Sequence, residues 1–176
     1  LAIHKIYLTK DSNDVAFDEL VAKYKSEDQS IEETTVEVPL NIDEKADADI
    51  DVAGFQAAWE TLKDTHEFFG MLRKFGVTRT QALRLAPNEN YAKKVEKDVI
   101  VKVLEGAASE KLPIMVFVGN RGNIQIHTGR VRKTMWHGDW FNVMDPDFNM
   151  HLDMSKIAQT WIVRKPTEDG EVTAIE

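Results

Sequence analysis

Up to about residue 112, hydrophobic side chains recur three and four residues apart, a spacing that predicts helices with one apolar face. Four helices are predicted. The first begins at Asp11 or Asn13, the second covers Val52–Phe75, the third starts at Thr78 and ends at Pro87, and the fourth runs from Val95 to Ala107. Leu1–Thr9 differs, because its apolar and polar residues alternate as in a half-buried strand.

Beyond Pro113 the hydrophobic period changes to two, and turn sequences rich in glycine, asparagine and aspartate separate the segments. The predicted strands are 114–118, 123–127, 131–136, 140–144, 148–153 and 160–164, and the chain stops within what resembles another. Connections this short leave no room for crossover helices. We therefore predict an α+β fold, with a large antiparallel sheet (a meander) and helices packed on one of its faces.

Residues 27–51 form a strongly acidic segment that contains a single basic residue and no aromatic residue. Too little apolar surface is present there to offset the entropy of ordering, so we expect an acidic linker, extended or mobile. This divides the chain into residues 1–26, the linker 27–51, and residues 52–176. Because the chain opens and stops within predicted strands, we expect a fragment of a longer polypeptide, truncated at its C-terminus.

Composition excludes several function classes. The formal net charge of −8 argues against nucleic acid as a partner, since phosphate backbones reward a basic surface. The absence of cysteine rules out disulfides, thiol catalysis and thiolate metal sites. No apolar run approaches the length of a membrane-spanning helix, so membrane insertion is not expected. His4, His127, His137 and His151 lie in separate predicted strands or turns, which argues against a metal cluster.

One histidine stands in an unexpected place. His66 shares a predicted helix face with five apolar residues, Phe55, Trp59, Leu62, Phe69 and Leu72. A buried imidazole without a partner costs about 1–3 kcal/mol, so this side chain needs one. It is either a core histidine bonded to a nearby backbone carbonyl, or an axial ligand to a flat, apolar metal cofactor such as haem. The spacing alone does not choose between them.

Three segments together resemble a known family. They are Ile114–Gly122 (IMVFVGNRG), Trp161–Thr167 (WIVRKPT) with Asp169–Gly170, and Thr65–Phe69 (THEFF). The residues of these segments and the spacing between the segments resemble the HemS/ChuS/PhuS family of bacterial cytoplasmic hemin-degrading and haem-trafficking proteins. Members of this family consist of two similar halves. By that resemblance, residues 1–26 correspond to the end of the first half and residues 52–176 to the C-terminal haem-binding repeat.

The resemblance also implies four site residues. His66 matches the family's iron-binding histidine, which makes it the metal ligand of haem b (iron protoporphyrin IX). Arg79 matches an arginine of the haem pocket, Lys165 a lysine that contacts a haem propionate, and Phe117 an aromatic residue that lines the pocket. The resemblance further implies an arginine from the first half on the open side of the iron, in a region outside this chain. No catalytic residue is assigned.

The function that the resemblance implies is cytoplasmic haem binding in haem-iron acquisition, supporting haem degradation and iron release. An alternative is a non-enzymatic chaperone that delivers haem to a separate haem oxygenase. Protein partners on these hypotheses are a haem oxygenase or an inner-membrane haem transporter, and the oligomeric state is open. Enzyme activity belongs to the full-length protein on this view, with the fragment inactive or weak. A domain without any ligand is the third interpretation.

Overall fold

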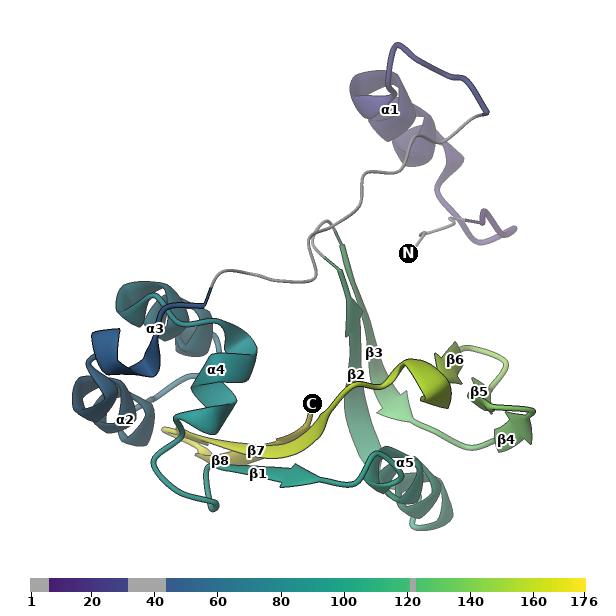
Figure 1. Ribbon diagram of the computed structural model, residues 1–176. Coiled ribbons are helices and arrows are strands. Elements are labelled where there is room, and N and C mark those ends of the chain that lie inside the picture. The colour runs from purple at the N-terminus through teal and green to yellow at the C-terminus, as the bar shows by residue number, and fades with distance from the viewer. Residues whose placement is uncertain (1–6, 32–43, 121–122) are drawn as a thin grey trace. The chain divides into compact units, whose positions relative to one another are not determined.

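The computed structural model describes residues 7–31, 44–120 and 123–176 (Figure 1). Most of the predicted strand Leu1–Thr9 lies outside these residues. By its internal contacts the chain divides into two units, Leu1–Leu40 with Val118–Gln125, and Asn41–Phe117 with Ile126–Glu176. The first contains α1 (Asp14–Tyr24), which begins where predicted, because the Asn13 side chain accepts a hydrogen bond from the backbone N–H of Ala16. The second unit contains both hydrophobic cores and all four predicted site residues.

Helices precede most of the strands, which confirms the predicted α+β class. The helices are α2 (Val52–Glu60), α3 (Glu67–Phe75), α4 (Arg79–Arg84) and α5 (Val99–Ser109), with 3₁₀ turns at Asp47–Asp49 and Met154–Lys156. The strands are β1 (Ala92–Val95), β2 (Pro113–Gly119), β3 (Ile124–Arg130), β4 (Thr134–His137), β5 (Trp140–Met144), β6 (Asn149–Asp153), β7 (Thr160–Thr167) and β8 (Gly170–Ile175). No helix of the described residues is long and apolar enough to cross a membrane.

The prediction of one large meander is only partly right. The described strands form three antiparallel sheets, with strand orders β1-β7-β8, β2-β3 and β4-β5-β6. The last of these is the expected meander, in which Asn142 lies opposite both Met135 and His151. The first is different, because β1 pairs with β7 far along the chain, with Ala92 opposite Val163. A 3₁₀ turn at Met154–Lys156 separates β6 from β7, so the chain leaves the meander before β7 begins.

The single helix predicted over Val52–Phe75 is wrong, because the chain forms α2 and α3 with a break between them. At the break, the Thr61 hydroxyl donates to the carbonyl of Ala57, which satisfies an acceptor at the end of α2. The Glu67 carboxylate accepts from the backbone N–H of Lys63, and Asp64 accepts from that of His66. The first turn of α3 is closed by the backbone, because the N–H groups of Glu67 and Phe68 donate to the carbonyls of Asp64 and Thr65.

The first core lies between helices α2–α4 and the sheet β1-β7-β8, one face of which these helices cover (Figure 1). Trp59 is its centre, with edge-to-face ring contacts to Phe55, Phe68 and Tyr91. Its indole N–H donates to the carbonyl of Arg164 on β7 at 3.0 Å. This bond ties α2 to the strand that carries Lys165.

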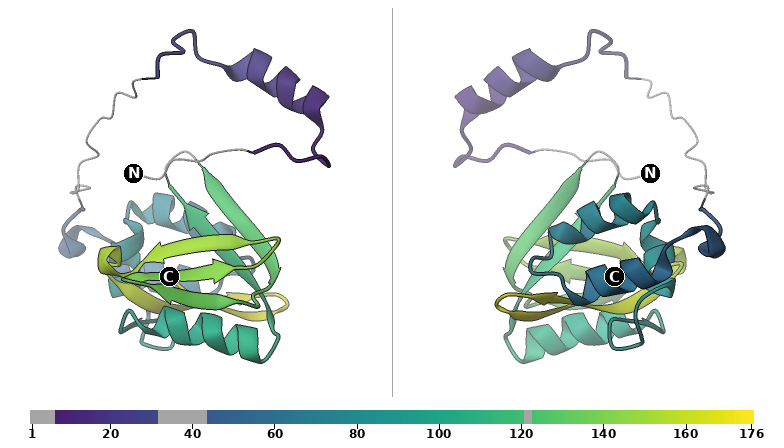
Figure 2. Two further views of the ribbon diagram at one scale, coloured as in Figure 1. Left: turned by 90° about the vertical axis from the view of Figure 1, so that its right-hand side faces the viewer. Right: turned by 90° about the vertical axis from the view of Figure 1, so that its left-hand side faces the viewer.

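The second core lies between α5 and the sheet β4-β5-β6, which are seen together in the left view of Figure 2. Val101 and Leu104 of α5 and Phe141 and Val143 of β5 are buried there. It contains none of the predicted site residues, and its role is to hold the meander against the helix.

The turn between α3 and α4 depends on Gly76. Its φ is +65°, in the left-handed region that glycine adopts without strain, and it caps the end of α3. The N–H of Val77 then bonds to the carbonyl of Leu72 at 3.1 Å, which completes the cap. As a result, α4 begins only two residues after Val77.

Replacing the central tryptophan tests the first core. Trp59→Phe removes the hydrogen bond to Arg164 and part of the buried ring, so we expect the free energy of unfolding to fall by about 1–3 kcal/mol. Urea unfolding followed by circular dichroism measures this. The matched control is Trp136→Phe, at a side chain that is 51% exposed, where we expect a loss below about 0.5 kcal/mol. Equal losses at both positions would contradict the central place of Trp59.

Candidate functional site

Two cations from distant parts of the chain meet at one carboxylate. Arg79, the first residue of α4, donates from Nε to Oε2 of Glu176 at 2.7 Å and from Nη2 to Oε1 at 2.6 Å. Lys165 of β7 donates from Nζ to the same Oε1 at 2.8 Å. Glu176 follows β8 and is held by its own backbone, which exchanges two hydrogen bonds with Trp161. We call Arg79, Lys165 and Glu176 the carboxylate clamp.

Two adjacent phenylalanines of α3 lie beneath these cations. The Lys165 ammonium is 4.6 Å from the ring centroid of Phe68, and the Arg79 guanidinium carbon is 5.4 Å from it. The same guanidinium carbon is 5.2 Å from the ring centroid of Phe69. Phe68 is fully buried, whereas Phe69 is 57% exposed. All three contacts are within the range of cation–π attraction, so the two rings of α3 pack against the cations of the clamp.

The charges in the clamp depend on one another. Lys165 is buried, with 8% of its surface exposed, and a buried ammonium requires an anionic partner to stay charged. Burial acts to raise the pKa of Glu176, but the hydrogen bonds and positive charges of Arg79 and Lys165 outweigh it, so this pKa lies below its ordinary value. With two cations around one carboxylate, the clamp keeps an excess positive charge. Such a group suits an anionic ligand.

His66 differs from the sequence prediction. It is not in the middle of a buried helix face, because the break between α2 and α3 places it at the N-cap of α3 with 92% of its side chain exposed. Of the six residues on the predicted stripe, Phe55, Trp59, Leu62 and Leu72 are buried, whereas His66 and Phe69 face solvent. The expected burial of the imidazole is therefore wrong, and so is a core role for it.

The His66 ring is nevertheless held in one orientation. Its Nδ1 lies 2.6 Å from Oδ1 of Asp64, which also accepts the backbone N–H of His66 at 2.8 Å. These two bonds, the backbone one first, hold the pKa of Asp64 below its ordinary value. Because a carboxylate only accepts, Nδ1 carries the hydrogen, and Nε2 has the lone pair in the neutral ring. This is the arrangement found in metal-binding histidines.

His66 and the clamp are connected along α3. His66 precedes Phe69 by three residues, with helical backbone angles, so the two side chains leave the same side of the helix. Phe69 in turn lies beneath Arg79. The described chain thus offers an exposed imidazole, an exposed aromatic ring and a pair of cations in succession.

Phe117 is not part of this group of contacts. It lies on β2, is 59% exposed, and makes no ring contact within the described part of the chain. Its place in a pocket stays a prediction. A surface depression elsewhere is lined by residues 94–97 and 157–160, and by none of the four predicted site residues.

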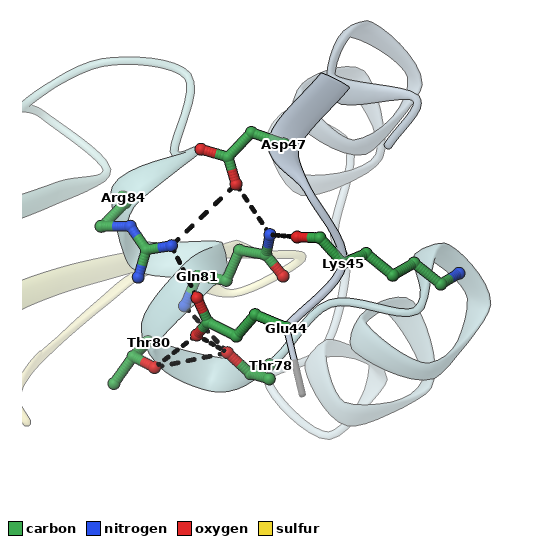
Figure 3. Close-up of polar contacts among 7 residues, drawn as sticks. All are labelled: Glu44, Lys45, Asp47, Thr78, Thr80, Gln81 and Arg84. Carbon is green, nitrogen blue, oxygen red and sulfur yellow. Dashed lines mark hydrogen bonds and ion pairs between the residues drawn. The ribbon is translucent and has the colours of Figure 1, made fainter. Parts of the chain in front are cut away.

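A second polar network holds α4, and with it Arg79, in place (Figure 3). The Thr78 side chain accepts from the backbone N–H of Gln81, as the predicted capping sequence requires, and donates to Glu44. Arg84, at the other end of α4, donates to Glu44 at 2.8 Å. Residues 44–51 of the expected linker are therefore packed on α4, whereas 32–43 lie outside the described residues.

The Gln81 side chain explains why this segment is fixed. It is fully buried, and its amide nitrogen donates to the carbonyl of Lys45 at 2.8 Å and to Asp47 at 2.7 Å (Figure 3). In a complete capping box it would instead reach back to Thr78. The capping sequence predicted the helix start correctly, but it gave no indication that Gln81 binds a segment 34 to 36 residues away.

Sequence reasoning missed three residues of the site, Asp64, Phe68 and Glu176. A signal for Asp64 was present in the capping-box spacing of Asp64 and Glu67, although in the structure the N-cap of α3 is His66, without a side-chain cap hydrogen bond. Phe68 stands in the Thr65–Phe69 segment that carries the resemblance. Nothing near Glu176 indicates that it meets two cations, because both pairings depend on the folded chain.

Comparison with known proteins identifies the family. Residues 76–176 match the family described as "Haemin-degrading HemS.ChuX domain". The "Hemin transport protein HemS" of Yersinia enterocolitica is 38% identical over 99% of this chain and 50% of its own length. The chain thus spans about half the length of the curated relatives it matches.

Solved structures agree with that match. The holo form of PhuS, "a heme-binding protein from Pseudomonas aeruginosa", is 45% identical, with a TM-score of 0.80 over 96% of this chain and 49% of that one. ChuS, "an E. coli Heme Oxygenase", is 35% identical, with a TM-score of 0.74 over 97% of this chain and 49% of that one. The resemblance noted in the sequence is thereby confirmed.

The network around Glu44 predicts a pH-dependent stability. Hydrogen bonds from Arg84 and Thr78 lower the pKa of Glu44 from 4.5 to about 2, so its contribution is present above 4.5 and is lost as the pH falls toward 2. Because the side chains of Glu44 and Arg84 are both partly exposed, we expect Glu44→Gln to lower the free energy of unfolding by about 1 kcal/mol at pH 7. Urea unfolding at several pH values measures this difference.

The difference between wild type and Glu44→Gln should shrink as the pH is lowered from 4.5 to 2. Glu105→Gln, at an exposed residue of α5, serves as the control and should leave stability unchanged throughout. A difference at Glu44 that is the same at pH 7 and pH 2.5 would show that its carboxylate is not the stabilising group.

Proposed function

Because the chain belongs to the haemin-degrading HemS.ChuX family, we propose that it binds haem, with His66 as the axial iron ligand and the carboxylate clamp at the propionates. The observation that carries this proposal is the meeting of Arg79 and Lys165 at one carboxylate, next to the helix α3, whose N-cap residue is His66. Haem presents iron, a flat apolar ring and two carboxylates, and the described residues offer a partner for each.

The iron end of the proposal rests on the exposed imidazole. The hydrogen bond from Nδ1 to Asp64 leaves the lone pair on Nε2, and haem iron takes a neutral imidazole nitrogen. Exposure of His66 suits a ligand that approaches from outside the fold. The hydrogen-bonded carboxylate orients the ring, as the outer partners of metal ligands do.

The propionate end rests on charge. Arg79 and Lys165 already bind a carboxylate, in the two-pronged geometry that guanidinium groups give to such ligands. Between this end and the iron, the exposed ring of Phe69 offers an apolar surface to the macrocycle. Phe117 remains our candidate for a further wall of the pocket, as the family resemblance implies.

The fate of the haem is a separate proposal. The matched family is described as haemin-degrading, whereas the Yersinia relative is called a hemin transport protein. We propose that the complete protein acts in haem-iron acquisition by supporting haem degradation, with delivery to a haem oxygenase as the alternative. We place this role in the cytoplasm, with an inner-membrane haem transporter as the natural source of haem.

A hemin titration tests the binding proposal. We expect addition of this chain to shift the Soret band of hemin, and His66→Ala to lose the spectrum of a histidine complex and at least about tenfold in affinity, since a metal–ligand bond is removed. His137→Ala, which removes another exposed histidine, is the matched control and should behave as wild type. An unchanged spectrum and affinity in His66→Ala would remove the axial assignment.

A turnover assay tests whether the complete protein degrades haem or carries it. The haem complex of the complete protein is incubated with a reductant and catalase, and cleaved tetrapyrrole and released iron are measured. We expect both products to appear, because a bound haem would supply the oxygen chemistry while the protein residues would hold and orient its ring. Intact haem after many hours, with transfer to an added haem oxygenase, would instead identify a carrier.

A further inference from the structure

Glu176 occupies the positions that a ligand carboxylate would need. It takes the Nε and Nη2 edge of Arg79, which is the edge used for two-pronged binding, and a proton of Lys165. The side chain of Lys165 is only 10% exposed, and that of Glu176 is 16% exposed. A carboxylate arriving from solvent can reach Arg79, whose side chain is 39% exposed, but it finds the two-pronged edge of the guanidinium and the Lys165 ammonium already bound to Glu176.

From this geometry we propose that Glu176 is an internal stand-in for the ligand, which leaves Arg79 and Lys165 when a carboxylate of the ligand takes its place. The proposal rests on the proposed function, because it assigns the incoming group to a haem propionate. It makes Glu176 a residue that limits affinity, although Glu176 itself does not bind the ligand.

An exchange of one carboxylate for another suits the energetics of this site. Lys165 cannot lose its anionic partner without leaving a buried charge unpaired, which is costly. In an exchange it is never left alone, because the propionate replaces the group that departs. Only the Glu176 side chain needs to move, since its backbone bonds to Trp161 do not involve the carboxylate.

A different role for Glu176 makes the opposite prediction. If it serves only to hold Arg79 and Lys165 in position for the ligand, removing its charge disorders the site and weakens binding. If it competes with the ligand, removing its charge frees both cations and strengthens binding. The sign of the effect separates the two roles.

The experiment compares two ligands and two variants. Glu176→Gln keeps the shape of the side chain but replaces an acceptor oxygen with an amide nitrogen that cannot accept from Arg79 or Lys165. Glu171→Gln is the matched control. It also removes a carboxylate, on the strand β8, and this carboxylate pairs with Arg164 at 3.3 Å rather than with the clamp. The ligands are haem and its dimethyl ester, which lacks free propionates, and affinities come from Soret titrations.

We expect Glu176→Gln to bind haem roughly three- to tenfold more tightly than wild type, because the propionate no longer has to displace a carboxylate from Arg79, whose side chain is 39% exposed. Its affinity for the dimethyl ester should not change, and Glu171→Gln should match wild type with both ligands. Glu176→Asp, which keeps the charge but shortens the side chain, should fall between wild type and Glu176→Gln, and it serves in place of the latter if that variant unfolds.

Three results would overturn the inference. Weaker or unchanged haem binding by Glu176→Gln, with wild type still binding haem, would refute the exchange and leave the proposed function intact. An equal gain with the dimethyl ester would show that the effect does not pass through a propionate. Failure of wild type to bind either ligand would refute the proposed function and the exchange together.

Discussion

A buried lysine needs an anion, and this requirement connects the elements that form the candidate site. Lys165 lies on β7 over the ring of Phe68 from α3, and its charge is balanced by Glu176 beyond β8. The same carboxylate holds Arg79 at the start of α4. A single ion cluster thus connects two helices to two strands. Any ligand that binds there meets cations that already have an anionic partner.

The sequence predicted local features well and distant pairings poorly. The start of α4 at Thr78 and the extent of β5 follow from the capping sequence and the alternation of apolar residues. The strand β1 was missed because two lysines interrupt its short apolar pattern, and only pairing with β7 makes it a strand. Propensity and periodicity describe neighbours in sequence, whereas β1 and Glu176 are fixed by residues some 70 and 100 positions away.

His66 shows how the same residue can be singled out by two arguments, of which the structure contradicts one, its place in a buried helix face. The three- and four-residue spacing suggested a buried imidazole, and the family resemblance suggested an iron ligand. The break between α2 and α3, where Asp64 and Glu67 accept backbone N–H groups, ends that helix early and brings the ring to the surface. An exposed imidazole with one nitrogen already hydrogen-bonded is better suited to a ligand from outside than the buried ring first predicted.

The handedness of the backbone at Gly76 has a consequence for the whole site. The tight reversal there returns the chain over α3 within a few residues, and so determines where the guanidinium of Arg79 lies above the two phenylalanine rings. A residue with a β-carbon at this position would be strained at the observed φ and would meet the Lys45 side chain. The arrangement of charges at the site therefore depends partly on Gly76, a residue that has no side chain with which to contact a ligand.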